Sequence, residues 1–218
     1  IEYAVQLVPG GLAEAFIVGE SFIGNSPCAM VLGDNLFFGN ELSKLLQDAA
    51  KKTEGATIFA YKVSEPERYG VVEFDRTGKA VSIEEKPKIP KSRFAVTGLY
   101  FYDNCVVEYA KSLAPSQRGE LEISDINRLY MEAGTLDVKI MSRGIAWLDT
   151  GTFDSLMDAS LFIETIQRRQ GLKVACLEEI AYRLGYITKD DVRKIALTMS
   201  QNSYGQYLID LLDENSIC

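Results

Sequence analysis

Two kinds of segment alternate along the first 150 residues of this 218-residue chain, and that alternation limits the folds open to it. Apolar runs such as ATIFAYKV (56–63) and TGLYFY (97–102) are typical of buried strands. Between such runs, apolar residues recur every three or four positions, which is typical of helices with one buried face. Strands that alternate with helices predict an α/β fold, in which helices cover a layered sheet.

We expect two parts in the chain, a sheet-containing domain over residues 1–152 and a helical region over residues 153–218. The expected strands are 2–7, 28–32 (fully buried), 56–63, 70–75, 80–84, 97–102, 136–141 and 145–148. The expected helices of the first part are 12–18, 40 to about 50, 104–113 and 123–133. Those of the second part are 153–170, 178–184, 189–199 and 203–212. The turn residues Arg-Thr-Gly at 76–78 predict a hairpin between two of the strands.

Charge and composition exclude several classes of protein. The net charge is −8, so we expect no binding to nucleic acid or to an anionic membrane. No apolar stretch is long enough to cross a bilayer. The four cysteines form no CxxC pair and are expected to be reduced thiols of a cytoplasmic protein. Because the sequence has no histidine, Ser–His and Cys–His nucleophile pairs and His-ligated metals are excluded.

Two acidic residues follow apolar runs at positions where α/β sheets commonly bind ligands. Asp34 follows AMVLG, and Asp149 follows IAWL. Ligands of open α/β sheets bind beyond the carboxyl ends of the strands, and Mg²⁺ prefers carboxylate oxygens together with substrate phosphates. The two carboxylates are therefore candidate Mg²⁺ ligands. The alternative is that each aspartate caps the helix or turn that follows it.

Two further stretches place polar residues at the ends of strands. Glu85 and Lys86 close one strand, where a carboxylate could accept sugar hydroxyls and an ammonium group could contact a phosphate. A solvated charge run is the alternative there. Tyr69 and Gly70 open another strand, and a glycine at that point lets a ligand approach the backbone closely. A plain turn is the alternative for this pair.

Two loops contain candidate ligand contacts as well. QLVPGG (6–11) precedes a helix N-terminus, whose backbone N–H groups favour a ligand rich in acceptors. It is neither a dinucleotide-binding fingerprint nor a Walker loop. In SQRGELEISDINR (116–128), Arg118 could contact a ligand, and Ser124 is expected to cap the helix that follows.

Six motifs occur in one order along the chain, and together they resemble a single family. They are LGDN (32–35), PERYGVVEFD (66–75), SIEEKP (82–87), VTGLYFYDN (96–104), RGELEISDINR (118–128) and AWLDTGT (146–152). In this order they resemble the glucose-1-phosphate thymidylyltransferases, sugar nucleotidyltransferases that make dTDP-glucose for dTDP-rhamnose and polysaccharide synthesis. The resemblance extends into the tail QGLKVACLEEIAYRLGYI (170–187). It implies a Rossmann-like layered mixed sheet with a C-terminal helical appendage.

The resemblance implies a reaction and a cofactor. Glucose 1-phosphate would attack the α-phosphorus of dTTP and displace pyrophosphate, with Mg²⁺ present. The attacking phosphate monoester has a second pKa of about 6, so it is already mostly dianionic near neutral pH and needs no general base. Catalysis of this kind rests on positioning and charge neutralisation, so the absence of histidine is no obstacle.

The resemblance also implies roles for particular residues. Asp34 and Asp149 would hold Mg²⁺ and, with Lys86, would form the catalytic set. The residues that would meet the thymine base and nucleoside are Gln6, Pro9 and Gly11. Those that would surround the sugar and its phosphate are Tyr69, Gly70, Glu85, Lys86 and Val96, with Arg118 as a phosphate contact. Asn35 would also bind substrate. The family's regulatory nucleotide site points to Glu179 and Arg183, and its usual assembly is a homotetramer.

The chain departs from the family's pattern at its start. The family opens with a glycine-rich loop of the form GGxGTRLxPxT, which cradles the triphosphate, and nothing from Ile1 onward matches it. We therefore expect that N-terminal strands of the sheet are missing from this sequence, and that these 218 residues alone have little transferase activity. The loop QLVPGG also has Leu7 where the family commonly has proline.

Other functions are left open by the sequence. A relative that uses UTP or CTP with the same sugar phosphate would differ mainly in the base-binding loop. An N-acetylglucosamine-1-phosphate uridylyltransferase would usually carry a hexapeptide β-helix after the catalytic domain, whereas this tail is predicted to be helical. From a different class, a non-catalytic interaction protein could keep the fold, although the retained Asp34, Glu85, Lys86 and Asp149 argue against it.

Overall fold

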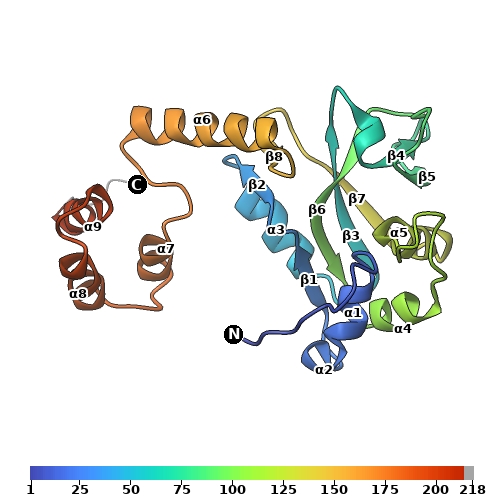
Figure 1. The fold of residues 1–218 in the computed structure, drawn as a ribbon, viewed down its shortest axis with the longest axis horizontal. Helices are drawn as coiled ribbons and strands as arrows, with labels where there is room; N and C mark the ends of the chain where they lie inside the picture. Colours follow the sequence, from blue (N-terminus) through green and yellow to red (C-terminus); the bar gives the residue numbers. More distant parts are fainter. Residues whose placement is uncertain (214–218) are drawn as a thin grey trace. The chain divides into compact units, whose positions relative to one another are not determined.

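The computed structural model describes residues 1–213, and the chain divides into two compact units, the first ending at Gly151 and the second beginning at Thr152. The strands of the first unit are β1 (Cys28–Val31), β2 (Asn35–Phe38), β3 (Ala56–Lys62), β4 (Gly70–Phe74), β5 (Ala80–Glu85), β6 (Phe94–Tyr102), β7 (Leu136–Ile140) and β8 (Ala146–Asp149) (Figure 1). Its α-helices are α1 (Glu14–Val18), α2 (Glu20–Ile23), α3 (Leu42–Ala50), α4 (Cys105–Ser112) and α5 (Ile123–Glu132), and one 3₁₀ turn spans Pro66–Arg68.

Six strands form one mixed sheet in the first unit. Five of them follow the order β5-β4-β6-β3-β7, and β1 pairs with the end of β6. The β3–β7 pair is parallel, whereas β6 pairs antiparallel with β1, β3 and β4, and β4 pairs antiparallel with β5. The expected α/β fold with a mixed sheet is therefore confirmed.

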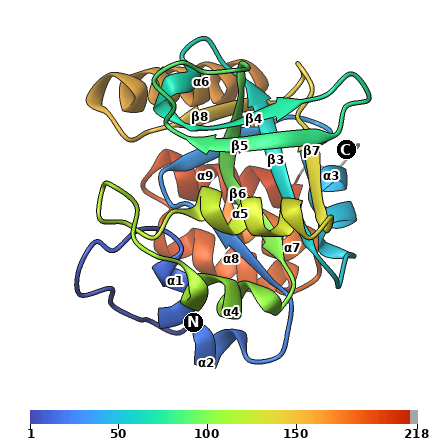
Figure 2. The ribbon, with the colours of Figure 1, turned by 90° about the vertical axis from the view of Figure 1, so that its right-hand side faces the viewer.

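Helices cover both faces of this sheet because side chains alternate along its central strands. On one face, Tyr100 and Tyr102 of β6 join Ile126 and Tyr130 of α5 in the larger core cluster. Figure 2 shows α5 crossing the strands on that side. On the other face, the neighbouring β6 residues Leu99 and Phe101 pack with Phe59 of β3 and with Leu45, Leu46 and Ala49 of α3. Those three α3 positions recur at helical spacing, as the sequence predicts.

Two strands lie outside the main sheet and form a sheet of their own. β2 and β8 pair antiparallel, with Asn35 opposite Asp149 and Phe38 opposite Ala146. Sequence patterning missed β2, because NLFF is only four residues long and follows Gly33 and Asp34, which are typical turn residues. This pairing decides the geometry of the candidate site.

Three other sequence predictions need correction. Residues 2–7 form no strand: within residues 1–213 no strand pairs with them, and Tyr3 and Leu7 are each 91% exposed. The expected buried strand at 28–32 is half-buried, because its alternate residues face outward and Val31 is 59% exposed. β6 begins at Phe94, before the expected start at Thr97, because Phe94 and Ala95 already pair with both β3 and β4.

The second unit is helical, as expected. Its helices are α6 (Phe153–Gln170), α7 (Leu177–Arg183), α8 (Lys189–Thr198) and α9 (Ser203–Asp213). Thr152 and Ser155 form a reciprocal capping box at the start of α6, and Gly171 ends this helix in the left-handed conformation. Buried side chains of Cys176, Val192 and Leu208 form a separate core for the last three helices.

Two chain-wide expectations can be compared with the described residues. Among residues 1–213, no helix is both long and apolar enough to span a membrane. The thiols of Cys28, Cys105 and Cys176 are free, and Cys218 lies outside the described residues.

Candidate active site

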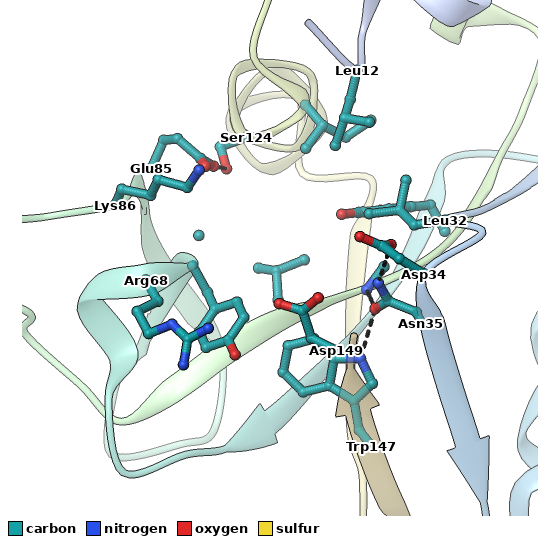
Figure 3. A pocket seen from close by; sticks show the side chains of 16 residues that line it. Leu12, Leu32, Asp34, Asn35, Arg68, Glu85, Lys86, Ser124, Trp147 and Asp149 are labelled. Atoms are coloured by element: carbon teal, nitrogen blue, oxygen red, sulfur yellow. Dashed lines mark hydrogen bonds between the residues drawn. The ribbon is translucent and has the colours of Figure 1, made fainter. Parts of the chain in front are cut away.

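An open pocket lies on the first unit, where the ends of several strands meet the start of α5. Its lining residues are Leu12, Leu32, Asp34, Asn35, Arg68, Tyr69, Gly70, Glu85, Lys86, Val96, Gly98, Tyr100, Ile123, Ser124, Trp147 and Asp149. Figure 3 shows the carboxylates of Asp34 and Asp149 on one side of the pocket, with Glu85 and Ser124 across from them. Of the residues that the sequence analysis proposed as catalytic, metal or substrate contacts, the structure gathers eight here: Asp34, Asn35, Tyr69, Gly70, Glu85, Lys86, Val96 and Asp149.

The two aspartates are neighbours because of the β2–β8 pairing. Asn35 lies opposite Asp149, and both the backbone N–H (2.9 Å) and the hydroxyl (2.8 Å) of Thr150 donate to the carbonyl oxygen of Asp34. A Cβ placed on Gly151 would stand 3.2 Å from Oδ1 of Asp149 and 3.8 Å from Oδ2 of Asp34. The glycine therefore leaves free the space beside both carboxylates, which the sequence reasoning did not anticipate.

The side chain of Asn35 links this acidic pair to the rest of the pocket. Its Oδ1 accepts hydrogen bonds from the indole N–H of Trp147 (2.6 Å) and from the backbone N–H of Gly98 (3.0 Å). Its Nδ2 donates to Oδ1 of Asp34 (2.9 Å). A Cβ on Gly98 would stand 2.5 Å from Oδ1 of Asn35, so only glycine allows this close approach.

Glu85 lies at the opposite wall, where it is bound by a buried serine. Ser124 is 2% exposed, and its hydroxyl donates to Oε2 of Glu85. The prediction that Ser124 caps α5 is therefore wrong: the N-cap is Glu122, and no side-chain hydrogen bond caps this helix in the described part of the chain. Burial raises the pKa of the Glu85 carboxyl, although the hydrogen bond from Ser124 opposes that rise.

Arg118 lies beside this wall within a group of acids. Its guanidinium is 2.9 Å from Glu120, 3.6 Å from Glu122 and 3.8 Å from Glu85, and it does not itself line the pocket. Because its side chain is 41% exposed, these ion pairs contribute little to stability.

Lys86 lines the pocket with a strained backbone. Its φ is 42°, in the left-handed region, and within residues 1–213 only Ala175 shares this property among the non-glycine residues. Its N–H donates to the carbonyl oxygen of Tyr69 (3.0 Å), which fixes the β5 end against the start of β4. Strain of this kind persists where surrounding structure overdetermines the conformation, and it is concentrated at functional sites.

The strained backbone at Lys86 leads to a prediction about the stabilities of two variants at this position. We expect Lys86→Gly to be more stable than Lys86→Ala by about 1 kcal/mol, because glycine adopts positive φ without the Cβ clash. At Lys44, an exposed residue within α3, the order should reverse, because glycine destabilises a helix relative to alanine by roughly 0.5–1 kcal/mol. Urea unfolding of the four variants measures both differences. The same order at both positions would contradict the strain at Lys86.

Aromatic side chains form the wall beside Asp149. The rings of Tyr69 and Trp147 lie 5.1 Å apart between centroids, and the guanidinium of Arg68 lies 5.6 Å from the Tyr69 ring centroid. Burial raises the pKa of the Tyr69 hydroxyl, and the negative charge of Asp149 adds to the rise. Sequence reasoning missed Trp147 and Arg68 as lining residues. The available signals were that Trp147 is the single tryptophan, two residues before Asp149, and that Arg68 adjoins Tyr69.

The three residues expected to meet the nucleoside lie outside the pocket lining. Gln6 and Pro9 are exposed, and the Gln6 amide donates to the carbonyl oxygen of Gly11 (3.1 Å). Gly11 has φ of 102°, and a Cβ there would stand 2.3 Å from the carbonyl oxygen of Leu121. This loop is thus fixed to the segment before α5, and its next residue, Leu12, does line the pocket.

The pair expected at a regulatory site lies in α7 of the second unit. Oε1 of Glu179 accepts a hydrogen bond from Nε of Arg183 (2.7 Å), and its other carboxylate oxygen accepts the hydroxyl hydrogen of Tyr207. The two residues are therefore brought together, as neighbours on one helix turn.

The pocket combines two oxygen-rich walls that suit different ligands. Within residues 1–213 no group of three or more His, Cys, Asp or Glu side chains that could hold a metal ion occurs, and Asp34 and Asp149 supply a pair of carboxylates at one wall. That donor set fits Mg²⁺, which is commonly bound by one or two carboxylates plus phosphates and water. The opposite wall offers the Glu85 carboxylate to hydroxyl donors and the Lys86 ammonium to an anion.

Comparisons with a family model and with solved structures show which class of protein this chain belongs to. The model of the Nucleotidyl transferase family matches residues 1–166. A UDP-glucose pyrophosphorylase solved with UDP-glucose shares the fold at 23% identity, with a TM-score of 0.65. A Bacillus anthracis protein, described as a glucose-1-phosphate thymidylyltransferase and solved with sucrose, is 43% identical with a TM-score of 0.66, over 74% of this chain and 64% of that one.

Curated relatives narrow the class further. The glucose-1-phosphate thymidylyltransferase of Neisseria meningitidis serogroup A is 59% identical over 97% of this chain, and that of Xanthomonas campestris is 51% identical over 100% of it. The chain spans 74% of the length of each of these two relatives, and less than two thirds of the solved Bacillus anthracis chain. The chain belongs to the nucleotidyl transferase family and, within it, to the glucose-1-phosphate thymidylyltransferases.

Proposed function

We propose that the protein carrying this chain transfers a thymidylyl group from dTTP to glucose 1-phosphate, with release of pyrophosphate and with Mg²⁺ as cofactor. The observation that carries the proposal is the pocket with two dissimilar walls: Asp34 and Asp149 lie together on one side, and Glu85 and Lys86 lie on the other. Nucleotidyl transfer to a sugar phosphate requires both a cation-stabilised triphosphate and an oriented sugar phosphate in one cavity.

In this proposal the side of the pocket with Glu85 and Lys86, called the sugar wall below, orients the attacking group. The carboxylate of Glu85 accepts hydrogen bonds from sugar hydroxyls, while the ammonium of Lys86 holds the sugar's phosphate near the α-phosphorus. Glycine at position 70 lets Ser124 and Glu85 pack against the strand, because a Cβ there would stand 2.8 Å from Oγ of Ser124 and 3.2 Å from Oε2 of Glu85. Tyr69 and Val96 complete the sugar contacts, and Arg118 exchanges a glutamate for the incoming phosphate.

The opposite side of the pocket, with Asp34 and Asp149, is called the acidic wall below, and it orients the nucleotide. Asp34 and Asp149 would hold Mg²⁺, which when bound neutralises charge on the triphosphate oxygens. The amide of Asn35 donates a hydrogen bond to Asp34 and so keeps that carboxylate oriented. Asn35 is itself a substrate contact at this wall. The loop with Gln6, Pro9 and Gly11 stands beside Leu12 at the pocket edge, where it would meet the base and nucleoside.

The assembly and compartment proposed here follow from the family. We propose a cytoplasmic homotetramer, with Glu179 and Arg183 of α7 near a regulatory nucleotide. The observation behind the regulatory part is that these two residues form one hydrogen-bonded group on α7, in which the Arg183 side chain is 40% exposed and the Glu179 side chain 12%. The base preference, dTTP against UTP or CTP, rests on the family alone.

A pyrophosphate-release assay on the full-length protein tests the proposal. With glucose 1-phosphate present, we expect turnover with dTTP and Mg²⁺ and at least tenfold lower efficiency with CTP. Omission of glucose 1-phosphate or chelation of the metal should stop the reaction. Equal turnover with all pyrimidine triphosphates would reassign the base, and no turnover with any of them would favour a non-catalytic protein of the same fold.

A further inference from the structure

One side chain in the pocket has a partner that the proposed reaction does not explain. Ser124 is the second residue of α5, is buried, and lines the pocket without facing solvent. A serine hydroxyl at this position in a helix often bonds to the backbone of its own helix. Here it donates instead to the carboxylate of Glu85, 39 residues away in β5.

The backbone of Gly70 packs closely against this hydrogen bond. A Cβ placed on Gly70 would stand 2.8 Å from Oγ of Ser124 and 3.2 Å from Oε2 of Glu85. Gly70 pairs with Glu85 across the β4–β5 hairpin, so the hairpin backbone and α5 hold the carboxylate between them. One oxygen, Oε2, is thus used by the protein, and the other lies toward Arg118 at 3.8 Å.

We propose that Ser124 is a positioning residue for sugar recognition: its hydroxyl keeps the Glu85 carboxylate ionised and oriented to accept hydrogen bonds from the sugar hydroxyls. This inference rests on the proposed function, because it takes Glu85 as the sugar's acceptor. A carboxylate confined between α5 and the hairpin is desolvated, and desolvation disfavours the charged form. A hydrogen bond donated to the carboxylate offsets that cost.

The groups around Glu85 shift its pKa in opposite directions, and the hydrogen bond from Ser124 is the largest effect that lowers it. Burial and the carboxylate of Glu122 raise the pKa of Glu85, whereas Ser124, Lys86 and Arg118 lower it. The buried hydroxyl of Tyr100 also lies close enough for its own pKa to be affected by Glu85. An ionised Glu85 accepts sugar hydroxyls best, so affinity is present above its pKa and falls as the pH drops through it. Removal of the Ser124 hydroxyl moves that fall to higher pH.

The test compares glucose 1-phosphate binding by Ser124→Ala with a matched serine. The hydroxyl of Ser116 donates to Oε1 of Glu122 (2.7 Å), so Ser116→Ala removes a serine–glutamate hydrogen bond from the same acidic group without touching Glu85. Calorimetry should show Ser124→Ala binding about tenfold more weakly than wild type at pH 6 and roughly twofold more weakly at pH 8.5. Ser116→Ala should stay within about twofold at both values. The phosphate of glucose 1-phosphate also titrates in this pH range, but it does so equally for every variant. Its effect therefore cancels when the affinity of a variant is divided by that of wild type at the same pH.

A second measurement separates the role of the hydrogen bond from a packing effect. Carbon NMR of the Glu85 carboxyl, without ligand, should show its titration midpoint moved upward in Ser124→Ala and unmoved in Ser116→Ala. If Ser124→Ala unfolds, Ser124→Cys, which keeps the size and weakens the donor, takes its place. A loss of affinity that is equal at every pH, or an unmoved midpoint, would overturn the inference while leaving the proposed function in place. Failure of the wild-type protein to bind glucose 1-phosphate would overturn both.

Discussion

Replacement of Asp149 by Asn is expected to lower metal-dependent turnover by about a thousandfold while the fold stays intact. The backbone N–H of Gly151 donates to Oδ1 of Asp149 (3.0 Å), and an asparagine keeps an oxygen in that place. What the substitution removes is one of the two negative charges beside Gly151. Because Asp34 and Asp149 are the two carboxylates at the acidic wall among residues 1–213, the substitution removes half of the negative charge available there to a divalent cation.

The measurement needs a readout besides turnover. Binding of Mn²⁺, followed by its EPR signal in the presence of dTTP, should weaken in Asp149→Asn, and the thermal midpoint should stay within a few degrees of wild type. Asp48→Asn is the control, because Asp48 is an exposed α3 residue that pairs with Lys51 and does not line the pocket. Full turnover in Asp149→Asn, or an equal loss in the control, would remove Asp149 from the cation site.

Replacement of Tyr102 by Phe should cost about 2 kcal/mol of stability, although it removes only one oxygen atom. The Tyr102 hydroxyl donates to Oδ1 of Asn127 (2.6 Å), and both side chains are almost fully buried, at 2% and 0% exposed. Within residues 1–213, Nδ2 of Asn127 already has no hydrogen-bond partner. After the substitution the amide oxygen would lose its donor as well, in a site that water does not reach.

A double substitution sharpens this prediction. In Tyr102→Phe/Asn127→Leu both polar groups are gone, so most of the lost stability should return, since replacing both partners by apolar groups is nearly neutral. Tyr3→Phe, at a side chain that is 91% exposed, is the control and should change the free energy of unfolding by less than about 0.5 kcal/mol. Urea unfolding can be followed by fluorescence of Trp147, the single tryptophan, which reports on the first unit. A double variant less stable than Tyr102→Phe would contradict the account.

Much of the fold could be predicted from the sequence because local residue patterns indicate most of its helices and strands. The α3 positions Leu45, Leu46 and Ala49 show a helical period, and the hairpin between β4 and β5 has turn residues in its sequence. The strand β2 could not be found this way. Its four residues carry no period, and they form a strand because β8, more than 100 residues later, pairs with them.

The candidate site divides in a similar way. The acids Asp34 and Asp149 could be named from their places after apolar runs, yet the reason that they meet is the unrecognised β2 pairing rather than a shared edge of the main sheet. Ser124 was misassigned because a serine near the start of a helix is usually a cap, and local sequence does not reveal a partner 39 residues away. Long-range partners of single side chains are set by tertiary packing.

The separate two-stranded sheet has a consequence for how such a protein can change. The spacing of Asp34 and Asp149 is set within the β2–β8 pair, whereas Tyr69, Gly70 and Glu85 belong to the β4–β5 hairpin of the main sheet. Substitutions in the hairpin can therefore reshape the sugar wall without moving the two carboxylates apart. Under the proposed function, such substitutions would change the acceptor molecule while the pair of carboxylates stays the same.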